Sequence, residues 1–584
     1  MKKLIYFIFI SLFMLVSCND DFLEKQPLDK ISEKAVFSNE GLLTAYVNTF
    51  YDAIPHPFTE GTLAAITDEG YFRYGGTSTN YIARGEMTPD NVVYISEGGY
   101  AHNTRMTYLN IWKRAYTYIR NMNDFLDQID EATVSENIKK QMKGEVYFFR
   151  AWTYANLIWR YGGVPIITKA YTTEDDFYDV KRNNYDDCVN FVLSDINSAL
   201  AYLPETPTQK GRVCRDVALA LKSRVWLYAA SPLFNDPDDP NPTGNNLIFK
   251  GVYNIHKWDS ARVAAKAVID LPGYDLADNY KDIWYDVNCP ELIWAKYFDR
   301  SWAKLTNLAQ VFYSPSYSFG GWLSCTPYEQ MVCEYEMKDT GKLPFEDGSG
   351  YDPSKPWDGR DPRFYETIIY PGCTFRGLVI DSYKSANPRS FPHGPFYNET
   401  VGTGGSGYWL KKWHIEDDVI SETDNATRFY PWFRLGEIYL NYAEACLNLG
   451  DEATCREYIN KIRNRASVMM PPIGDEITGD ELREKLIHER RIELAFEDKR
   501  FFDLRRWKLA NIYENIPGYG IEVVKQTNGT LVYNIAQKGV NGQPDYSKCL
   551  TKIVKKFFDQ FYLQPIPGNE MTKAQGVLIQ NPGY

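Results

Sequence analysis

The sequence has few of the residues that build metal centres and disulfide frameworks. Among 584 residues there are only 6 histidines and 10 cysteines. The histidines are scattered without an H-x-x-x-H spacing, and no two cysteines are spaced as C-x-x-C. Once Cys18 is set aside, the remaining cysteines are odd in number and cannot all pair. We therefore expect neither a zinc site nor a disulfide scaffold, and we expect most cysteines to be small buried hydrophobes.

Signatures of cofactor binding and of nucleophilic catalysis are also missing, since the chain contains no P-loop and no G-x-S-x-G elbow. Gly402 to Gly407 matches G-x-G-x-x-G, but Tyr408 to Trp413 resembles a strand where a dinucleotide fingerprint would open a helix. Asn235 to Asn241 is rich in oxygen ligands and leaves a structural calcium ion open. It lacks EF-hand spacing, however, and favours a solvated turn. We expect no catalytic residue and no cofactor.

The chain has no excess of positive charge. Its formal net charge is −12, and without the first 17 residues 62 basic side chains face 76 acidic ones. Nucleic acid and anionic lipid both reward clustered lysine and arginine, so this balance argues against either as a partner. Beyond the N-terminus, no apolar stretch is long enough to cross a bilayer.

The N-terminus carries an export signal. Lys2 and Lys3 precede an apolar run from Leu4 to Val16, which is too short to span a bilayer permanently. The run ends in Leu-Val-Ser followed by Cys18, which resembles a bacterial lipobox, where the cysteine is acylated and becomes the first mature residue. We expect residues 1–17 to be a lipoprotein signal peptide and Cys18 to hold the protein at a membrane. The alternative is an uncleaved anchor.

Apolar spacing predicts a mainly α fold of consecutive helix pairs, similar to tetratricopeptide units. The segments with helical periodicity are 105–129, 135–161, 185–203, 215–230, 258–269, 432–449, 452–467, 478–497 and 501–510. Gly450 is a plausible C-cap, and Thr478 with Glu481 fits a capping box. The length permits one very large domain or several ordinary ones, and the helical parts lie at about 105–270 and 427–511. Between them, about 271–426 reads as an irregular part with short strands.

The segment from Glu489 to Arg506 could be mistaken for catalytic machinery. Glu489, Glu493 and Glu497 fall on one helix face, where like charges repel unless cations are near. Candidate cations are Arg490, Arg491, Arg500, Arg505 and Arg506. We interpret the segment as a structural ion network, because buried charges are tolerated only when paired. The alternative is a glycosidase centre with two carboxylic acids, one of which needs a raised pKa.

Aromatic residues are plentiful, with 44 tyrosines, 31 phenylalanines and 14 tryptophans. Two non-periodic segments, 68–103 and 294–322, place such rings among Gly, Ser and Asn. Ring faces can cover the C–H face of a sugar, while Asp, Asn and Arg hydrogen-bond its hydroxyl groups. The alternative is that the rings only pack the loops. The predicted ligand-binding residues are Asp68, Arg73, Tyr74, Tyr100, Asn103, Tyr297, Trp302, Tyr313, Tyr317 and Trp322.

Several segments resemble the SusD/RagB family. Glu489-Arg-Arg-Ile-Glu-Leu-Ala-Phe-Glu497, followed by Arg500-Phe-Phe-Asp-Leu-Arg-Arg-Trp507, is similar to the signature of that family. Other similar segments, in chain order, are Asp21–Pro27, Phe148–Pro165, Asp361–Phe364, Arg434–Ala445, Tyr562–Pro567 and Asn581–Tyr584. The acidic residues after Cys18 resemble the surface-export signal of Bacteroides-type lipoproteins.

The resemblance implies a single domain over 18–584, with a fold of four tetratricopeptide-like units that support an irregular half, and it makes about 271–426 the ligand side. It also implies a lipoprotein in the outer membrane that faces the cell exterior and binds oligosaccharide without cleaving it. The implied partner is a SusC-like TonB-dependent transporter. We therefore expect a non-catalytic glycan-binding protein, and we keep two alternatives, a surface glycoside hydrolase and a helical scaffold that binds only proteins.

Overall fold

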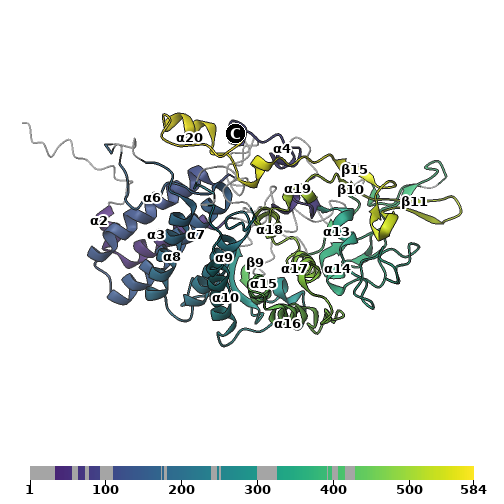
Figure 1. The fold of residues 1–584 in the computed structure, drawn as a ribbon, viewed down its shortest axis with the longest axis horizontal. Coiled ribbons are helices and arrows are strands. Elements are labelled where there is room, and N and C mark those ends of the chain that lie inside the picture. The colour runs from purple at the N-terminus through teal and green to yellow at the C-terminus, as the bar shows by residue number, and fades with distance from the viewer. Residues whose placement is uncertain are drawn as a thin grey trace, which may run out of the picture.

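A computed structural model of the chain describes residues 33–55, 63–72, 78–92, 110–172, 174–175, 180–238, 246–248, 251–298, 325–390, 392–397, 405–414 and 428–584. The molecule is elongated, with the early helices at one end and a group of small sheets at the other (Figure 1). The C-terminus lies beside α20 on one long side. No helix within these described ranges combines the length and apolarity needed to cross a membrane.

The early half is built of consecutive helices. They are α2 (Glu33–Phe37), α3 (Glu40–Phe50), α6 (Trp112–Gln128), α7 (Glu136–Tyr161), α8 (Tyr185–Tyr202), α9 (Arg215–Ala230) and α10 (His256–Ile269). From α6 onward, each helix packs against the next along the chain, and α10 packs against the later helix α15 (Leu435–Asn448). The predicted mainly α fold with paired helices is confirmed.

The later helices continue the pattern through α16 (Glu452–Arg463), α17 (Gly479–Glu493), α18 (Arg500–Arg506) and α19 (Ala510–Tyr513). Helix α15 ends as predicted at Gly450, whose φ of 84° is the left-handed conformation that glycine tolerates. There the Asp451 amide donates to the Cys446 carbonyl at 2.9 Å, which closes a Schellman motif.

Several helix boundaries differ from the prediction, including the end of α16 at Arg463 instead of 467 and that of α17 at Glu493 instead of 497. Residues 432–434 belong to a strand, and α15 begins only at Leu435. The Thr478 side chain makes no capping hydrogen bond, so the predicted capping box does not form. The segment predicted as one helix over 501–510 is instead α18 and α19, separated at Lys508, whose φ is 58°. Most of these errors lie at element ends, where local side-chain chemistry competes with tertiary packing, whereas the break at Lys508 lies inside the predicted helix.

The strands are short and form small sheets. The longest pair, β2 (Leu292–Phe298) with β9 (Arg428–Arg434), is antiparallel and leads into α15. In the irregular part, β1 (Gly70–Tyr71) pairs with β3 (Thr326–Pro327) and β4 (Ile368–Ile369) pairs with β8 (Trp409–Leu410). The remaining early strands are β5 (Thr374–Phe375), β6 (Leu378–Val379) and β7 (Lys384–Ser385).

The sequence reasoning missed a group of strands near the C-terminus. They are β10 (Gly518–Gly520), β11 (Glu522–Lys525), β12 (Leu531–Asn534), β13 (Gln537–Lys538), β14 (Pro544–Asp545) and β15 (Leu550–Ile553). Strand β11 pairs with β12 and, in parallel, with β7 from the irregular part.

Short helices fill the connections: α4 (Ser78–Ala83), α11 (Asp282–Tyr285), α13 (Glu329–Cys333), α14 (Pro362–Thr367) and α20 (Gly568–Lys573). The 3-10 turns are η2 (Tyr51–Ala53), η3 (Leu63–Ala65), η4 (Ile129–Glu131), η7 (Val540–Gly542) and η8 (Asp559–Tyr562).

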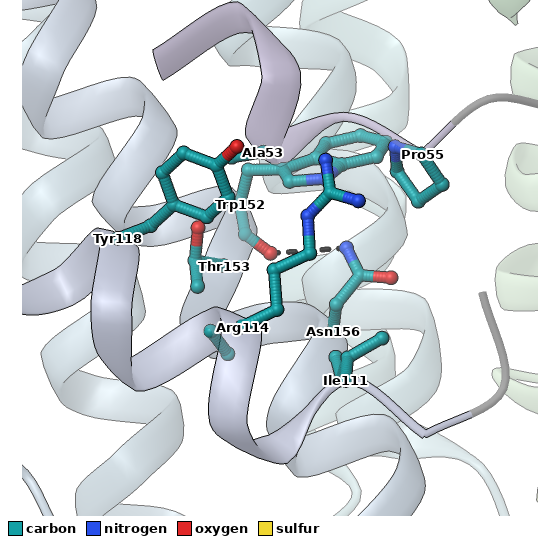
Figure 2. Close-up of a pocket in the computed structure, with 9 residues that line it drawn as sticks. Ala53, Pro55, Ile111, Arg114, Tyr118, Trp152, Thr153 and Asn156 are labelled. Atoms are coloured by element: carbon teal, nitrogen blue, oxygen red, sulfur yellow. Dashed lines mark hydrogen bonds between the residues drawn. The ribbon is translucent and has the colours of Figure 1, made fainter. Parts of the chain in front are cut away.

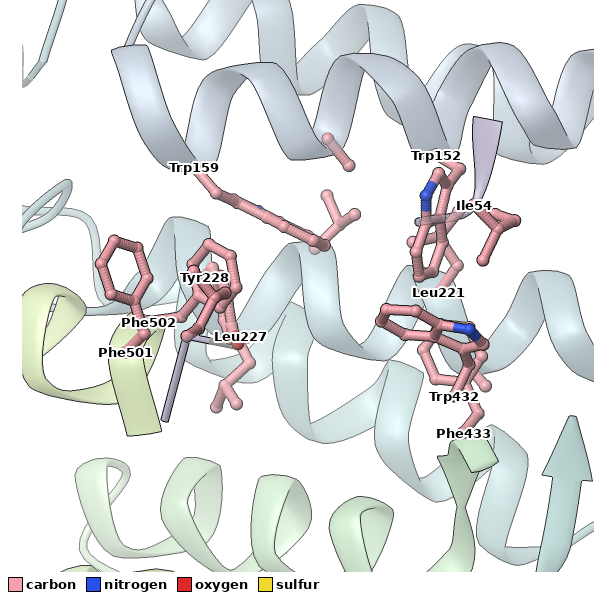
Figure 3. Packing of buried hydrophobic residues seen from close by; sticks show 14 of the residues in the cluster. Ile54, Trp152, Trp159, Leu221, Leu227, Tyr228, Trp432, Phe433, Phe501 and Phe502 are labelled. Carbon is pink, nitrogen blue, oxygen red and sulfur yellow. The ribbon is translucent and has the colours of Figure 1, made fainter. Parts of the chain in front are cut away.

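An aromatic core joins the two helical parts (Figure 3). Trp152 on α7 lies edge-on to Trp432 and Phe433 of β9, with ring centroids 5.4 and 5.9 Å apart. Two turns further along, Trp159 contacts Tyr228 of α9 at 4.8 Å and Phe502 of α18 at 6.0 Å. Seven of the nine described cysteines are buried, as expected of small hydrophobes.

Candidate functional site

The three glutamates of α17 and the residues after it occupy the centre of a buried ion network. Glu493 accepts hydrogen bonds from Arg434 and Arg465 at 2.8 Å each and from Arg363 at 3.0 Å. Glu497 accepts from Arg434 at 2.7 Å, and all of these side chains are buried. The interpretation of this segment as a structural ion network therefore agrees with the geometry.

The cations that hold these glutamates are not the neighbours that the sequence indicated. They come from β9 (Arg434), from α14 (Arg363), and from α16 and the turn after it (Arg463 and Arg465). The arginines close in sequence face other carboxylates. Arg490 pairs with Asp503, Arg491 with Asp68 and Glu334, Arg500 with Asp68, Arg505 with Glu514, and Arg506 with Glu444 and Asp503.

The electrostatics of Glu493 do not suit a proton donor. Burial alone would raise its pKa, but Arg465, Arg434 and Arg363 outweigh burial and hold the pKa well below its usual range. The pKa of Glu497 is lowered in the same way by Arg434 and Lys412. A glycosidase acid needs a raised pKa, so this cluster fits a scaffold better than a paired-carboxylate centre.

The two aromatic-rich segments meet in the structure at their roots. Tyr71 pairs with Thr326 and Gly70 with Pro327 in the antiparallel β1–β3 pair. The Tyr328 amide also donates to the Glu69 carbonyl at 3.0 Å. The start of the first segment and the residues just after the second segment therefore lie side by side in the described part of the chain.

Asp68 lies at this root but faces inward. It is only 5 % exposed, and its two oxygens accept from Arg500 at 3.0 and 2.9 Å. Arg491 contacts the same carboxylate at 2.9 Å, and the two arginines outweigh burial to hold the pKa of Asp68 well below its usual range. The expectation that Asp68 faces a ligand is corrected, because both of its oxygens are engaged by buried arginines.

Tyr297 is the other predicted ligand residue that the structure describes. It lies half-buried on β2, with its ring 5.9 Å from that of Phe429 and the Lys210 ammonium 5.9 Å from its centroid. The remaining predicted residues lie outside the described ranges and stay predictions: Arg73, Tyr74, Tyr100, Asn103, Trp302, Tyr313, Tyr317, Trp322 and the lipidation site Cys18.

An exposed aromatic site that we did not include among the predicted ligand residues lies on α4. The Tyr81 ring is 40 % exposed, and the Arg84 guanidinium lies 5.0 Å from its centroid. Arg84 in turn pairs with Glu86 at 2.9 Å. An exposed ring face beside charged hydrogen-bonding groups is the combination expected of a saccharide-binding site.

A small pocket lies between η2, α6 and α7, close to where the described chain resumes at residue 110 (Figure 2). Arg114 spans its mouth, donating to the Asp52 carbonyl, with its guanidinium 5.5 Å from the Tyr118 ring centroid. Trp152 and Asn156 of α7 line the far wall, where the Asn156 amide donates to the Trp152 carbonyl at 3.0 Å. The sequence reasoning missed this pocket, because the spacing of Arg114 and Tyr118 reads as an ordinary helix face.

The end of β2 reaches the same neighbourhood. The Lys296 ammonium donates to the Ile54 carbonyl at 2.7 Å, and burial lowers its pKa to about 8. Ile54 is followed by Pro55, which lines the pocket. The end of η2, the start of α6 and strand β2 are therefore joined where the second aromatic-rich segment begins.

A larger cleft of about 580 Å³ lies elsewhere, between the end of α9 and the chain terminus. Lys508 and Asp236 pair across it at 2.9 Å, and Tyr562 lines it. None of its lining residues belongs to the two aromatic-rich segments.

The structure leaves the calcium hypothesis untested. The Asn235 side chain bonds to backbone groups of Ala230 and Asn254, and Asp236 is taken by Lys508. Among the described residues, no three His, Cys, Asp or Glu side chains gather as a metal site would require. Residues 239–241 of the candidate stretch lie outside the described ranges.

Comparison with known proteins decides the family. A family model described as the SusD family matches residues 290–584, which is half of the chain. The chain belongs to the SusD family. A second model, described as starch-binding and associating with the outer membrane, matches residues 21–227. The second match covers α6 to most of α9 and the SusD-family match covers α15 to α19, with residues 228–289 between the two.

Curated relatives align with most or all of the chain at low identity. SusD-like protein P2 of Formosa agariphila is 23 % identical, and the alignment covers 100 % of both chains. A SusD-like protein of Bacteroides ovatus is also 23 % identical, over 91 % of this chain and 88 % of that protein.

Solved structures have the same fold. A SusD-like protein of Bacteroides fragilis superposes with a TM-score of 0.74 at 25 % identity, covering 96 % of this chain and 100 % of that one. A SusD-like carbohydrate-binding protein of the same species gives a TM-score of 0.71 at 22 % identity, over 93 % and 99 %. A laminarin-binding SusD-like protein gives 0.59 at 19 % identity, over 94 % and 100 %.

Proposed function

We propose that this SusD-family protein is a glycan-binding lipoprotein of the cell surface. It captures an oligosaccharide without cleaving it and delivers it to a SusC-like TonB-dependent transporter in the outer membrane. The observation that carries the proposal is the β1–β3 pair, which roots both aromatic-rich segments at one place on the scaffold. The names of two relatives in structure, one carbohydrate-binding and one laminarin-binding, support the same ligand class.

The described side chains of the two segments have the chemistry that a saccharide needs. Tyr81 offers an exposed ring, and Arg84 and Glu86 place hydrogen-bonding groups beside it. Tyr297 adds a half-exposed ring at the start of the second segment. Such a site combines an apolar platform with polar groups that fix orientation. Within the segments, Arg73, Tyr74, Tyr100, Asn103, Trp302, Tyr313, Tyr317 and Trp322 are proposed to complete the contact surface.

Membrane attachment is proposed through Cys18. The lipobox-like sequence that precedes it supports acylation, and the acidic residues after it support transfer to the exterior. A single acyl chain binds membranes only marginally, so stable anchoring takes more than one chain or a partner in the membrane. Metabolic labelling with a fatty-acid probe should mark the wild type and leave Cys18→Ala unlabelled.

The test of glycan binding is affinity gel electrophoresis of the mature protein in a panel of polysaccharides. We expect retardation by at least one glycan. Tyr81→Ala should weaken it, whereas Tyr202→Ala should not, because Tyr202 is similarly exposed at 36 % but lies on α8 among the early helices. Equal loss in both variants, or retardation by no glycan, would contradict the proposal.

The same incubations separate binding from hydrolysis. Unchanged reducing-end content over time is the expected result for a binding protein. Release of reducing ends would favour the glycoside hydrolase alternative. Co-purification with an outer-membrane β-barrel transporter from detergent extracts tests delivery, and a lipidated protein that copurifies with no channel would contradict that part.

A further inference from the structure

The turn between α17 and α18, residues 494–499, contacts the roots of several segments that are distant in sequence. The Phe496 amide donates to Glu69 Oε1 at 2.8 Å, just before β1. The Ala64 amide in η3 donates to Asp498 Oδ1 at 3.1 Å. Lys412, just after β8, donates to the Ala495 carbonyl at 2.9 Å. One short turn thus contacts two stretches of chain that are distant in sequence, residues 63–72 and the residues after β8.

The backbone of this turn is held in an unusual conformation. Phe496 and Asp498 both have a φ of 59°, in the left-handed region that a bulky residue such as phenylalanine rarely adopts. Strain of this kind persists only where the surroundings determine the conformation. The Phe496 ring covers Gly70 of β1, where an added Cβ would meet Phe496 Cε1 at 3.3 Å and Cys325 Sγ at 2.8 Å. The turn and the β1–β3 pair are therefore fitted to each other.

Glu69 is the residue through which the turn reaches both aromatic-rich segments. Its side chain accepts from Phe496, while its backbone carbonyl accepts from the Tyr328 amide at 3.0 Å. Its neighbour Asp68 is fixed by Arg500 and Arg491. The side chain of Glu69 is 1 % exposed, and Oε2 has no hydrogen-bond partner among the described residues.

The charge state of Glu69 is part of this geometry. Burial raises its pKa to about 8, and the hydrogen bond from Phe496 lowers the pKa only in part. The titratable and charged groups that face it include Asp68 and Asp498, which disfavour its ionisation, Arg500 and Arg491, which favour it, and the Tyr335 phenol. Near neutral pH the native arrangement therefore holds Glu69 mainly as a neutral acid whose carbonyl oxygen accepts from Phe496.

We propose that Glu69 is a positioning residue for glycan binding, which sets the root of both aromatic-rich segments through its bond to the α17–α18 turn. This inference rests on the proposed function. The buried ion network thereby has a second role. The turn of residues 494–499, which belongs to this network, also fixes where the two aromatic-rich segments begin.

The test compares two substitutions at one position. Glu69→Ala removes the acceptor of the Phe496 amide and leaves a buried donor unsatisfied, whereas Glu69→Gln keeps an acceptor of the same shape. We expect Glu69→Ala to bind the best-retained glycan about tenfold more weakly, and Glu69→Gln to recover most of that loss. Asp195→Ala, which breaks the buried Arg150–Asp195 pair between α7 and α8, is the control for lost stability alone. It should lower the melting temperature without changing affinity at a temperature where it is folded.

A pH profile supplies a readout that a purely structural role would not move. Wild-type affinity should fall as pH rises from 6.5 to 9 through ionisation of Glu69, and the profile of Glu69→Gln should be flatter. The profile still decides the question if Glu69→Ala does not fold. Parallel wild-type and Glu69→Gln profiles would overturn the inference, as would wild-type affinity in a folded Glu69→Ala. If the wild type itself binds no glycan, the proposed function fails instead.

Discussion

Helices α7 and α17 are both buried in their C-terminal halves, but they are buried by different means. From Phe148 to Tyr161, every side chain of α7 is buried, and most of them are apolar or aromatic. The last turns of α17 bury Glu489, Arg490, Arg491 and Glu493 instead. The first helix is held mainly by packing, and the second by charge pairs that leave few oxygens unsatisfied. The fold therefore combines a packed half around α7 with an ionic half around α17, and different substitutions should destabilise each half.

The largest effect should come from the centre of the ionic half. Glu493→Ala leaves Arg434, Arg465 and Arg363 short of a buried partner, so we expect the free energy of unfolding to fall by about 5 kcal/mol. Urea denaturation followed by circular dichroism measures this loss. A loss below about 1 kcal/mol would mean that the arginines find other partners and that the network is redundant.

Truncation in the packed half should cost slightly less. Trp152→Ala removes a ring that contacts Trp432 and Phe433, and we expect a loss of about 4 kcal/mol from lost burial and the cavity that remains. The same denaturation assay applies. If Trp152→Ala costs clearly more than Glu493→Ala, the ranking of the two halves is reversed.

A smaller effect should appear as a pH dependence. Burial raises the pKa of Glu69 to about 8 and that of Asp498 to about 7, so the native state binds protons that the unfolded state has released. Their stabilising contribution is full below the ordinary pKa of a carboxyl group and is lost as pH rises through about 7 to 8. Between pH 5 and 8 the wild type should lose about 2 kcal/mol more stability than Glu69→Gln.

The acids of the ionic half do not interfere in this window. The pKa values of Glu493 and Glu497 are lowered, so their contribution is lost only when pH falls well below 5. Identical stability slopes for the wild type and Glu69→Gln between pH 5 and 8 would show that Glu69 is ionised in the native state.

The smallest effect should come from an ion pair on the surface. Arg84 and Glu86 pair at 2.9 Å with side chains 31 % and 46 % exposed. Glu86→Ala should change the free energy of unfolding by about 0.5 kcal/mol or less, and salt should reduce even that. A loss comparable to that of Glu493→Ala would remove the distinction between buried and exposed pairs.

The helices of the packed half could be predicted from the sequence. For the ionic half, the sequence predicted that an ion network exists but not which residues pair in it. Apolar spacing located α7 and α9 to within a residue, because a helix face is a local property of the chain. The partners of Glu493 lie 59 residues away at Arg434 and 130 residues away at Arg363. Spacing along the helix instead indicated the adjacent arginines, which face other carboxylates. Long-range pairing depends on the tertiary fold, which local patterns do not contain.

For the candidate site, the sequence predicted which kinds of residue take part but not how they are arranged. Aromatic residues in non-periodic sequence singled out the two segments, and the β1–β3 pair joins their roots. Asp68 was misread because a carboxylate among aromatic residues looks the same in sequence whether it faces a sugar or two arginines. Tyr81 lay in the same segment, but only its exposure distinguishes it from the buried Tyr71. The C-terminal strands were missed because each has only two to four residues.

The most direct measurement is calorimetric titration of the mature protein with oligosaccharides of the polysaccharide it retains best, followed by chain-length analysis of the recovered sugar. The account predicts saturable binding and a sugar of unaltered length. Absence of binding across the whole panel, or recovery of shortened chains, would contradict it.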